Sequence, residues 1–210
     1  MSKPDKHVRI GEALARQSSV FYGGEGDAWY DRNKDAVLNP IVVRELTSIK
    51  SSPKTIVEMG CSHGRYLYEM SKHYGDKCHY IGYDPSAAAV YNGKQLYPNL
   101  DLRLGASRAF YGLPADIIVF GFCLYLVDRE DIFSIVNDAD WCLSNGGHIV
   151  IHDFDPEHPH KVPYHHKDGI WSYKMDYASL WTANPVYRLL SKTTTQDGQA
   201  ISVIRKEGFP

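Results

Sequence analysis

The sequence predicts an α/β fold: a doubly wound, mostly parallel sheet of seven strands that ends in an antiparallel hairpin. Between residues 54 and 154, short apolar runs rich in β-branched residues alternate with amphipathic segments of helical period. That alternation is typical of parallel strands joined by helices that cover both faces of a sheet. Two further segments, 186–195 and 200–206, are joined at Asp197-Gly198, a pair typical of a hairpin turn.

Composition and charge indicate an ordinary globular protein. Of the 210 residues, 43% are hydrophobic and 23% are charged, and the net charge of −2 gives no overall field that attracts nucleic acid. No apolar run approaches the ~18 residues of a membrane-spanning helix, and the first residues lack the apolar core of a signal peptide. The four cysteines occur singly, as in reduced cytoplasmic proteins. We therefore expect a cytoplasmic protein that binds neither nucleic acid nor membrane.

The first quarter of the chain differs from the rest. Residues 1–50 are predicted to form a helical lid segment, and residues 51–210 the main domain, in one compact unit overall. A glycine-rich loop is predicted over 21–33, next to Trp29 and Tyr30, two large side chains that need cover. Such a loop can close over a ligand. Alternatively, its aromatic side chains only pack this segment onto the main domain, and the sequence leaves both possibilities open.

The predicted first strand, 55–57, leads into a turn between two glycines. Glu58 follows the strand directly, and Gly60, Cys61 and Gly64 precede a helix. The spacing Glu-x-Gly-x-x-x-Gly differs from the Gly-x-Gly-x-x-Gly of dinucleotide-binding proteins, and no P-loop lysine follows. Because a buried acid is costly unless it meets a ligand or a donor, the turn is predicted to hold a ligand without a pyrophosphate. The alternative is an ordinary strand-to-helix turn.

The second predicted strand, 80–84, ends in an acid. Asp84 lies one strand beyond the glycine turn, about where dinucleotide-binding folds hold a ribose. A carboxylate suits that task because it can accept hydrogen bonds from both the 2′ and the 3′ hydroxyl. The alternative role of Asp84 is a simple cap of the next helix.

Three more predicted strands add side chains to the same edge of the sheet. They are 100–104, which precedes Ala106 and Ser107; 115–124, which contains Phe120, Gly121 and Phe122; and 148–154, which contains His152 and Asp153. Asp128 is expected to cap a long helix between the last two strands, and 145–147 to stop it. Because ligands bind at the carboxyl ends of the strands in such sheets, this edge is the predicted site.

A long loop rich in histidine is predicted over 155–175, and loops of that length are often functional. Its histidines lack the spacing of regular metal sites, so we expect no metal. An imidazole can instead remove a proton from an attacking oxygen or nitrogen. The predicted catalytic residues are His152, Asp153, His165 and His166. For the loop histidines, simple contact with substrate or solvent is the alternative.

The glycine turn after Glu58, followed by Asp84, resembles motif I and the ribose-binding acid of class I S-adenosylmethionine (SAM) methyltransferases. This resemblance covers residues 54–154. It implies a Rossmann-like methyltransferase fold, SAM as the cofactor, and an adenine near Ala106 and Ser107. The acid often found near that adenine is absent, and the Asn-Pro-Pro-Tyr type motif of nucleic-acid amino methyltransferases is replaced by Gly-Phe-Cys, which argues against methylation of bases.

The flanking segments are similar to a narrower group, the small methyltransferases associated with pseudaminic acid and other bacterial surface-sugar biosynthesis. The glycine-rich lid and the tail around 164–166 and 173–177 carry this resemblance. It implies that Tyr30 and Arg32 contact SAM, with Arg32 pairing to its carboxylate, and that the acceptor is sugar-like. The full set of predicted cofactor contacts is Tyr30, Arg32, Glu58, Gly60, Cys61, Gly64, Asp84, Ala106, Ser107, Phe120, Gly121 and Phe122.

The function predicted from the sequence is therefore SAM-dependent methyl transfer to a small polar acceptor, a hydroxyl of a sugar, a sugar-nucleotide or a surface-glycan precursor. Three alternatives remain at this point. One is a methyltransferase for an unrelated small-molecule nitrogen or oxygen acceptor, and another is a SAM-binding protein without catalysis. The third, a nicotinamide-dependent oxidoreductase on a similar sheet, is disfavoured by the missing Gly-x-Gly-x-x-Gly.

Overall fold

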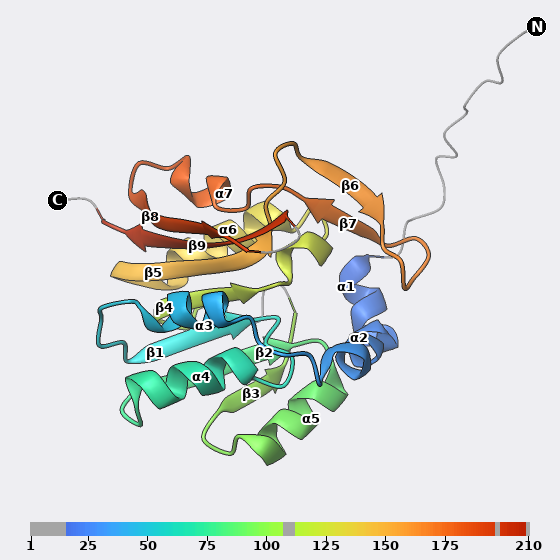
Figure 1. Cartoon of the computed structure of the whole chain (residues 1–210), viewed down its shortest axis with the longest axis horizontal. Coiled ribbons are helices and arrows are strands. Elements are labelled where there is room, and N and C mark those ends of the chain that lie inside the picture. Colours follow the sequence, from blue (N-terminus) through green and yellow to red (C-terminus); the bar gives the residue numbers. More distant parts are fainter. Residues whose placement is uncertain (1–15, 107–111, 196–197, 209–210) are drawn as a thin grey trace, which may run out of the picture.

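The computed structural model describes residues 16–106, 112–195 and 198–208 (Figure 1). Its main sheet has seven strands in the order β3-β2-β1-β4-β5-β9-β8. The bounds of these strands are β1 Thr55–Met59, β2 His79–Asp84, β3 Asp101–Leu104, β4 Ala115–Gly121, β5 Leu143–Phe154, β8 Tyr187–Thr194 and β9 Gln199–Lys206. Strands β1 to β5 pair in parallel, whereas β9 pairs antiparallel with both β5 and β8. The predicted fold class is confirmed.

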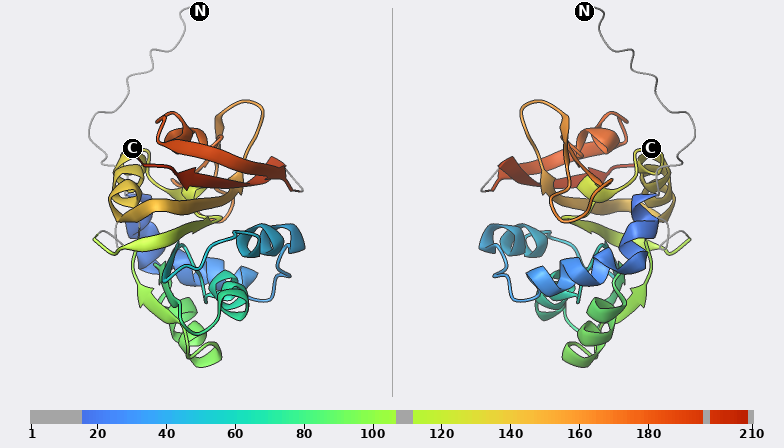
Figure 2. Two further views of the ribbon diagram at one scale, coloured as in Figure 1. Left: turned by 90° about the vertical axis from the view of Figure 1, so that its left-hand side faces the viewer. Right: turned by 90° about the vertical axis from the view of Figure 1, so that its right-hand side faces the viewer.

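Helices cover both faces of this sheet, as Figure 2 shows with the sheet seen from its sides. Their bounds are α3 Pro40–Thr47, α4 Arg65–Tyr74, α5 Ala87–Leu96, α6 Ile132–Cys142 and α7 Ser179–Thr182. Strand β4 shows why both faces are apolar, because its successive side chains point to opposite sides. Ile117 packs in the cluster that contains Leu46 of α3 and Leu67 of α4. Its neighbour Ile118 packs in the other cluster, with Ile135 of α6.

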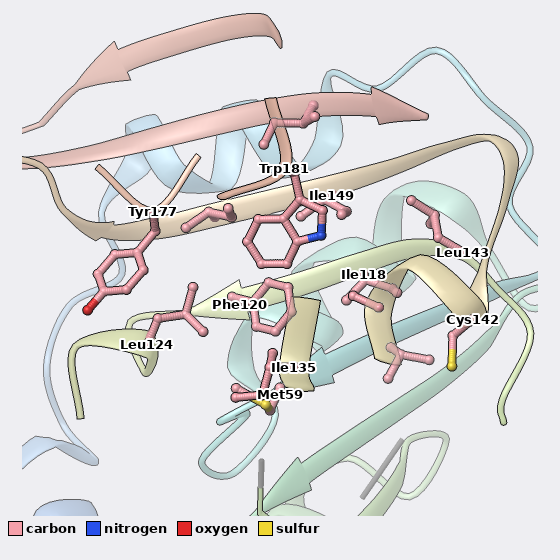
Figure 3. Packing of buried hydrophobic residues seen from close by; sticks show 14 of the residues in the cluster. Met59, Ile118, Phe120, Leu124, Ile135, Cys142, Leu143, Ile149, Tyr177 and Trp181 are labelled. Atoms are coloured by element: carbon pink, nitrogen blue, oxygen red, sulfur yellow. The ribbon is translucent and has the colours of Figure 1, made fainter. Parts of the chain in front are cut away.

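The core between the sheet and helices α6 and α7 is closed by large rings (Figure 3). The rings of Phe120 and Trp181 lie 5.3 Å apart between centroids, and both side chains are fully buried. Burial of large aromatic side chains contributes strongly to stability. The rigid sheet that results holds the carboxyl ends of β1, β2 and β4 in fixed positions.

The N-terminal segment is helical, which corrects the loop predicted over 21–33. It contains α1 Gln17–Val20, a π-helical turn Phe21–Glu25 and α2 Gly26–Asn33, with a left-handed residue, Gly24, at the kink. The residue with a positive φ is a glycine, which adopts it at little cost. Figure 1 shows α1 and α2 beside the carboxyl ends of the parallel strands. The division at residue 50 into a lid and a main domain stays a prediction.

Three other expectations are corrected. The segment 155–175 is a hairpin of β6 His160–Pro163 and β7 Trp171–Lys174 rather than a loop without structure. Helix α6 begins at Ile132, so Asp128 does not cap it; the Asp128 carboxylate accepts the backbone N–H groups of Gln17 and Ser18. The glycines at 146–147 do not stop α6, which ends at Cys142, but lie inside β5.

No helix in the described ranges is both long and apolar enough to cross a membrane.

Candidate active site

Two cavities lie side by side at the carboxyl ends of the parallel strands. They share one wall, which is formed by Trp29, Gly60 and Phe122. The first, here called the apolar cavity, is also lined by Ser18, Phe21, Gly26, Met59, Asp84, Pro85, Gly105, Ala106, Cys123, Leu126, Val127, Asp128 and Asp131. The second, here called the polar cavity, is also lined by Asn33, Ala36, Val37, Leu38, Glu58, Cys61, Ser62, His63, Arg65, Tyr66, Gly121, Tyr125, His152, Tyr164, His166 and Gln199.

The glycine turn forms the floor between the two cavities. Gly60 has a φ of 71°, and a Cβ atom at this position would lie 2.5 Å from the Cβ of Cys123. A side chain there would be strained and would also clash. The N–H groups of Gly60 and Cys61 both donate to the carbonyl of Tyr83, which fixes the turn against β2. The turn then ends at Gly64, which has a φ of 87° and directly precedes the first residue of α4.

Asp84 presents a fixed carboxylate to the apolar cavity. One oxygen accepts the N–H of Ser62 at 2.7 Å, and the other accepts the N–H of Ser86 at 2.8 Å. Burial raises the pKa of Asp84 to about 6. The cap of α5 is the Ser86 side chain, which accepts from the N–H of Ala89, so capping this helix does not require Asp84. Each carboxylate oxygen has a second acceptor position left for a ligand hydroxyl.

Glu58 is the most deeply buried acid of the polar cavity, with 1% of its surface exposed. Its Oε2 atom has no hydrogen-bond partner among the described residues. Burial, and next the charge of Asp84, raise the pKa of Glu58 well above its usual value. A buried carboxyl without a full set of partners is costly. The position therefore suits a ligand that brings a cation or a hydrogen-bond donor.

His152 also lines the polar cavity and holds a neutral imidazole. Burial lowers its pKa to about 4. Its Nδ1 atom is 3.5 Å from the hydroxyl of Tyr66, and its Nε2 atom is 3.2 Å from Oε1 of Gln199. The Phe122 ring packs against the imidazole with centroids 5.4 Å apart. Because it is uncharged near neutral pH, His152 can accept a proton there.

A family model described as a methyltransferase domain matches residues 30–193, which is most of the chain. The chain belongs to this family. The match includes the strand ends, the glycine turn and Asp84. The protein is therefore a SAM-dependent methyltransferase, and the sequence-based predictions of fold, cofactor and enzyme class are confirmed.

Solved structures share the architecture at low sequence identity. A Burkholderia thailandensis 1,6-didemethyltoxoflavin-N1-methyltransferase, solved with 1,6-didemethyltoxoflavin and S-adenosylhomocysteine, is 13% identical with a TM-score of 0.67, covering 99% of this chain and 94% of its own. DhpI, solved with S-adenosylhomocysteine, is 15% identical with a TM-score of 0.64, and the alignment covers 92% of this chain and 96% of DhpI. The mitomycin 7-O-methyltransferase MmcR is 12% identical with a TM-score of 0.64, and the alignment covers 90% of this chain and 60% of MmcR. A search of curated protein sequences finds no significant match.

Several predicted cofactor contacts of this methyltransferase line a cavity. They are Glu58, Gly60, Cys61, Asp84, Ala106, Gly121 and Phe122. Phe122 has a φ of 61°, an unusual value for a residue other than glycine, and such strain often occurs at functional sites. A Cβ atom at Gly121 would lie 2.5 Å from Oε1 of Glu58, so a side chain there would displace that carboxyl. Ser107 lies outside the described residues.

Other predicted cofactor contacts lie elsewhere. Tyr30 is buried with its ring 5.3 Å from that of His63, and Phe120 is buried in the core. Arg32 donates to Glu25 at 2.6 Å and to the hydroxyl of Tyr164 at 3.1 Å. None of these three side chains lines either cavity. Their contact with SAM stays a prediction, and for Arg32 it competes with an existing ion pair.

The predicted catalytic residues also separate. His152 and His166 line the polar cavity, and the His166 ring lies 5.3 Å from that of Tyr164. His165 is exposed and lines neither cavity, so the geometry does not support a catalytic role. Asp153 is 2% exposed and accepts the N–H groups of Leu124 and Tyr125. It therefore orders the chain after β4 and presents no free edge to the polar cavity.

Arg65, Tyr66 and Gln199 are polar groups of the second cavity that were not predicted from the sequence. Trp29, expected from the sequence either to close over a ligand or to pack on the main domain, forms part of the wall between the cavities. Arg65 and Tyr66 directly follow the glycine turn, so their place in the first turn of a helix was a usable signal. Gln199 had no such signal, because only the pairing of β9 with β5 brings it to His152.

In the described ranges, no three histidine, cysteine or acidic side chains gather in a way that could hold a metal ion.

Proposed function

We propose that this enzyme transfers the methyl group of SAM to a hydroxyl of a small, sugar-like acceptor bound in the polar cavity. The observation that carries this proposal is the shared wall of Trp29, Gly60 and Phe122. It divides the site into a mostly apolar half and a half lined by hydrogen-bonding side chains. SAM has the same two parts, a flat adenosine and a charged methionine end, and its reactive centre lies between them.

The adenosine part fits the apolar cavity. Asp84 would accept hydrogen bonds from the ribose hydroxyls, and Ala106 and Leu126 would lie beside the adenine. The methionine end would follow the glycine turn into the polar cavity. There the buried carboxyl of Glu58 would gain the cationic partner that it lacks. Proximity of opposite charge favours the ionised form of a carboxyl, so binding of SAM would lower the pKa of Glu58.

Arg65 is better placed than Arg32 to bind the carboxylate of SAM. It lines the polar cavity at the first residue of α4 and forms no ion pair within the described part of the chain. Its guanidinium donates a hydrogen bond to the carbonyl of Lys34 at 3.3 Å. Arg32, in contrast, already pairs with Glu25. A guanidinium without a carboxylate partner gains most from a new one.

Bound SAM supplies an electrophilic methyl group on a sulfonium. The protein holds the acceptor oxygen in line with that methyl and accepts the proton that the hydroxyl loses. As the new O–CH₃ bond forms, the S–CH₃ bond breaks and its electron pair stays on sulfur. The proton passes to Nδ1 of His152, the ring nitrogen next to the Tyr66 hydroxyl. Solvent would remove it afterwards.

The lining of the polar cavity suits a hydroxylated acceptor. Aromatic faces from Tyr66, Phe122 and Tyr125 can pack against a sugar ring, while Asn33 and Gln199 can bond its hydroxyls. The same aromatic wall supports a second candidate, a planar heterocycle methylated on a ring nitrogen or a phenolic oxygen. A planar aromatic ring would gain more stacking energy on these side chains than a sugar ring would.

A transfer assay separates these possibilities. Enzyme and SAM with a labelled methyl group are incubated with two panels, nucleotide sugars and planar hydroxylated heterocycles. We expect label in the nucleotide-sugar panel. Label only in the heterocycle panel would establish the second candidate and overturn the sugar-like acceptor. If calorimetry shows no binding of S-adenosylhomocysteine to the wild-type chain, the placement of the donor is wrong as well.

A further inference from the structure

The structure assigns a task to Gln199: we propose that its amide oxygen fixes the proton of His152 on Nε2 and so keeps the lone pair of Nδ1 available for the acceptor. This inference rests on the proposed function, in which His152 takes the acceptor proton. Gln199 is a positioning residue, because it would act through His152 and not on the methyl group.

The contact between Gln199 and His152 determines which ring nitrogen carries the proton. A neutral imidazole carries one ring proton, and the nitrogen that carries it can only donate. The partner of Nε2 is Oε1 of Gln199, at 3.2 Å, and an amide oxygen can only accept. The Nε2 atom therefore carries the proton. The Nδ1 atom is left as an acceptor, 3.5 Å from the hydroxyl of Tyr66.

The backbone of Gln199 is held in place by hydrogen bonds on both sides. Its backbone lies at the first residue of β9, paired with Phe154 of β5. Its carbonyl accepts the N–H of Thr195 at 2.8 Å, and the carbonyl of the preceding Gly198 accepts the N–H of Asp155 at 2.8 Å. Bonds on both sides hold the residue in one place. This fixed backbone places the start of the Gln199 side chain at a constant position beside His152.

Three uncharged groups surround the imidazole of His152. The groups that face it are the Tyr66 hydroxyl from α4, the Phe122 ring after β4 and the Gln199 amide from β9. The pKa of Tyr66 is raised to about 12, chiefly by burial, so this hydroxyl keeps its proton near neutral pH. None of the three is charged at that pH. The position of the ring proton is then set by hydrogen bonding, and the Gln199 amide oxygen is the acceptor next to Nε2.

The test is nitrogen NMR of protein labelled with ¹⁵N-histidine and saturated with S-adenosylhomocysteine. The signals of His152 are assigned by their absence in His152→Gln. At pH 7 we expect a protonated Nε2 and an unprotonated Nδ1 in the wild type. In Gln199→Leu, which keeps the size but lacks the acceptor, the two tautomers should mix.

Gln199→Glu is the matched variant, because a carboxylate accepts but cannot donate. It should keep the proton on Nε2 and raise the pKa of His152 by about one unit or more, as an opposite charge nearby does. A protonated Nδ1 in the wild type, or unchanged spectra in both variants, would overturn the task assigned to Gln199. Whether the wild type binds S-adenosylhomocysteine is a separate result, read from the NMR samples as the ligand is added. No binding would contradict the proposed function itself.

Discussion

The two halves of the site are built from different sources. The apolar cavity takes Asp84 and the glycine turn from consecutive strand ends, which the chain brings together locally. The polar cavity gathers Arg65 from α4, His152 from β5, Tyr164 from the β6–β7 connection and Gln199 from β9. The glycine turn and Asp84 are therefore encoded in short motifs, although other walls of this cavity, such as Ser18, Phe21 and Leu126, come from distant segments. The half that receives the acceptor depends on contacts between distant segments.

This difference has a functional consequence. A βα turn with a following acid serves any member of a methyltransferase family, because all of them bind one donor. The acceptor differs between members, and side chains contributed by separate elements can change without disturbing the donor site. We therefore expect substitutions of His152 and Tyr66, on the acceptor side of the polar cavity, to change turnover. Substitutions of the donor contacts Asp84 and Arg65 should change donor affinity.

The largest expected effect follows from His152→Gln. This change removes the proposed proton acceptor but keeps a polar side chain of similar reach. General base catalysis contributes about 10²- to 10⁴-fold, so kcat should fall by that factor. S-adenosylhomocysteine binding, measured by calorimetry, should stay within about threefold of the wild type, because His152 is assigned no contact with the donor. A large loss of donor binding with unchanged kcat would reverse the assigned roles of the two cavities.

The next effect concerns Asp84→Asn in the apolar cavity. Hydrogen bonds to a charged group are worth about 1.5–3 kcal/mol, so the Kd for S-adenosylhomocysteine should rise about 10- to 100-fold. Asp131→Asn is the matched control, because Asp131 lines the same cavity but pairs with Arg16. Calorimetry of the two variants checks this. Equal losses in both would mean that the charge of the cavity matters, and not a ribose contact of Asp84.

The pH dependence of donor binding sharpens the same point. The pKa of Asp84 is about 6 in the free protein, and ligand hydroxyls favour the ionised carboxylate. Binding should therefore be strongest above pH 6 and weaken as the pH falls below it, by roughly tenfold per pH unit if only the carboxylate binds. In Asp84→Asn the slope should become shallower, and the part that remains belongs to Glu58, whose raised pKa SAM binding would also lower. An unchanged slope in the variant would mean that Asp84 does not contribute to the pH dependence.

A smaller effect separates two arginines. Arg65→Met should weaken S-adenosylhomocysteine binding about tenfold, the lower end for a hydrogen bond to a charge. Arg32→Met is the comparison and should affect thermal stability more than donor binding, because Arg32 joins Glu25 to Tyr164. The opposite ranking in calorimetry would restore Arg32 as the partner of the SAM carboxylate.

The smallest effect is expected for Tyr66→Phe. Loss of one ordinary hydrogen bond is worth about 1 kcal/mol, which corresponds to about fivefold. The change should lower kcat by that factor, since the hydroxyl lies beside Nδ1 of His152. Single-turnover measurement of labelled-methyl transfer reports this directly. A loss as large as that of His152→Gln would make Tyr66 the proton acceptor instead.

The sequence predicted most of the fold because strand and helix periodicity is local. The glycine turn, Glu58 and Asp84 were likewise found from spacing along a short stretch. Gln199 was missed because its place depends on how β9 pairs with β5, and the sequence contains no local sign of that pairing. The hairpin after β5 was missed because its strands have only four residues each.

Asp128 shows how a local pattern can mislead. An acid before an apolar helical run is the usual sign of an N-cap. The helix starts later, at Ile132, and the carboxylate instead binds the first N–H groups of α1. Those N–H groups need an acceptor in any case. The same side chain therefore satisfies a distant helix end, which only the folded chain can show.

A crystal structure with S-adenosylhomocysteine tests the central claim most directly. The account predicts ribose hydroxyls within hydrogen-bond distance of the Asp84 carboxylate and the sulfur beside the wall formed by Trp29, Gly60 and Phe122. The methionine end should then lie in the polar cavity near Glu58 and Arg65. An adenosine found in the polar cavity, or a ribose away from Asp84, would contradict it.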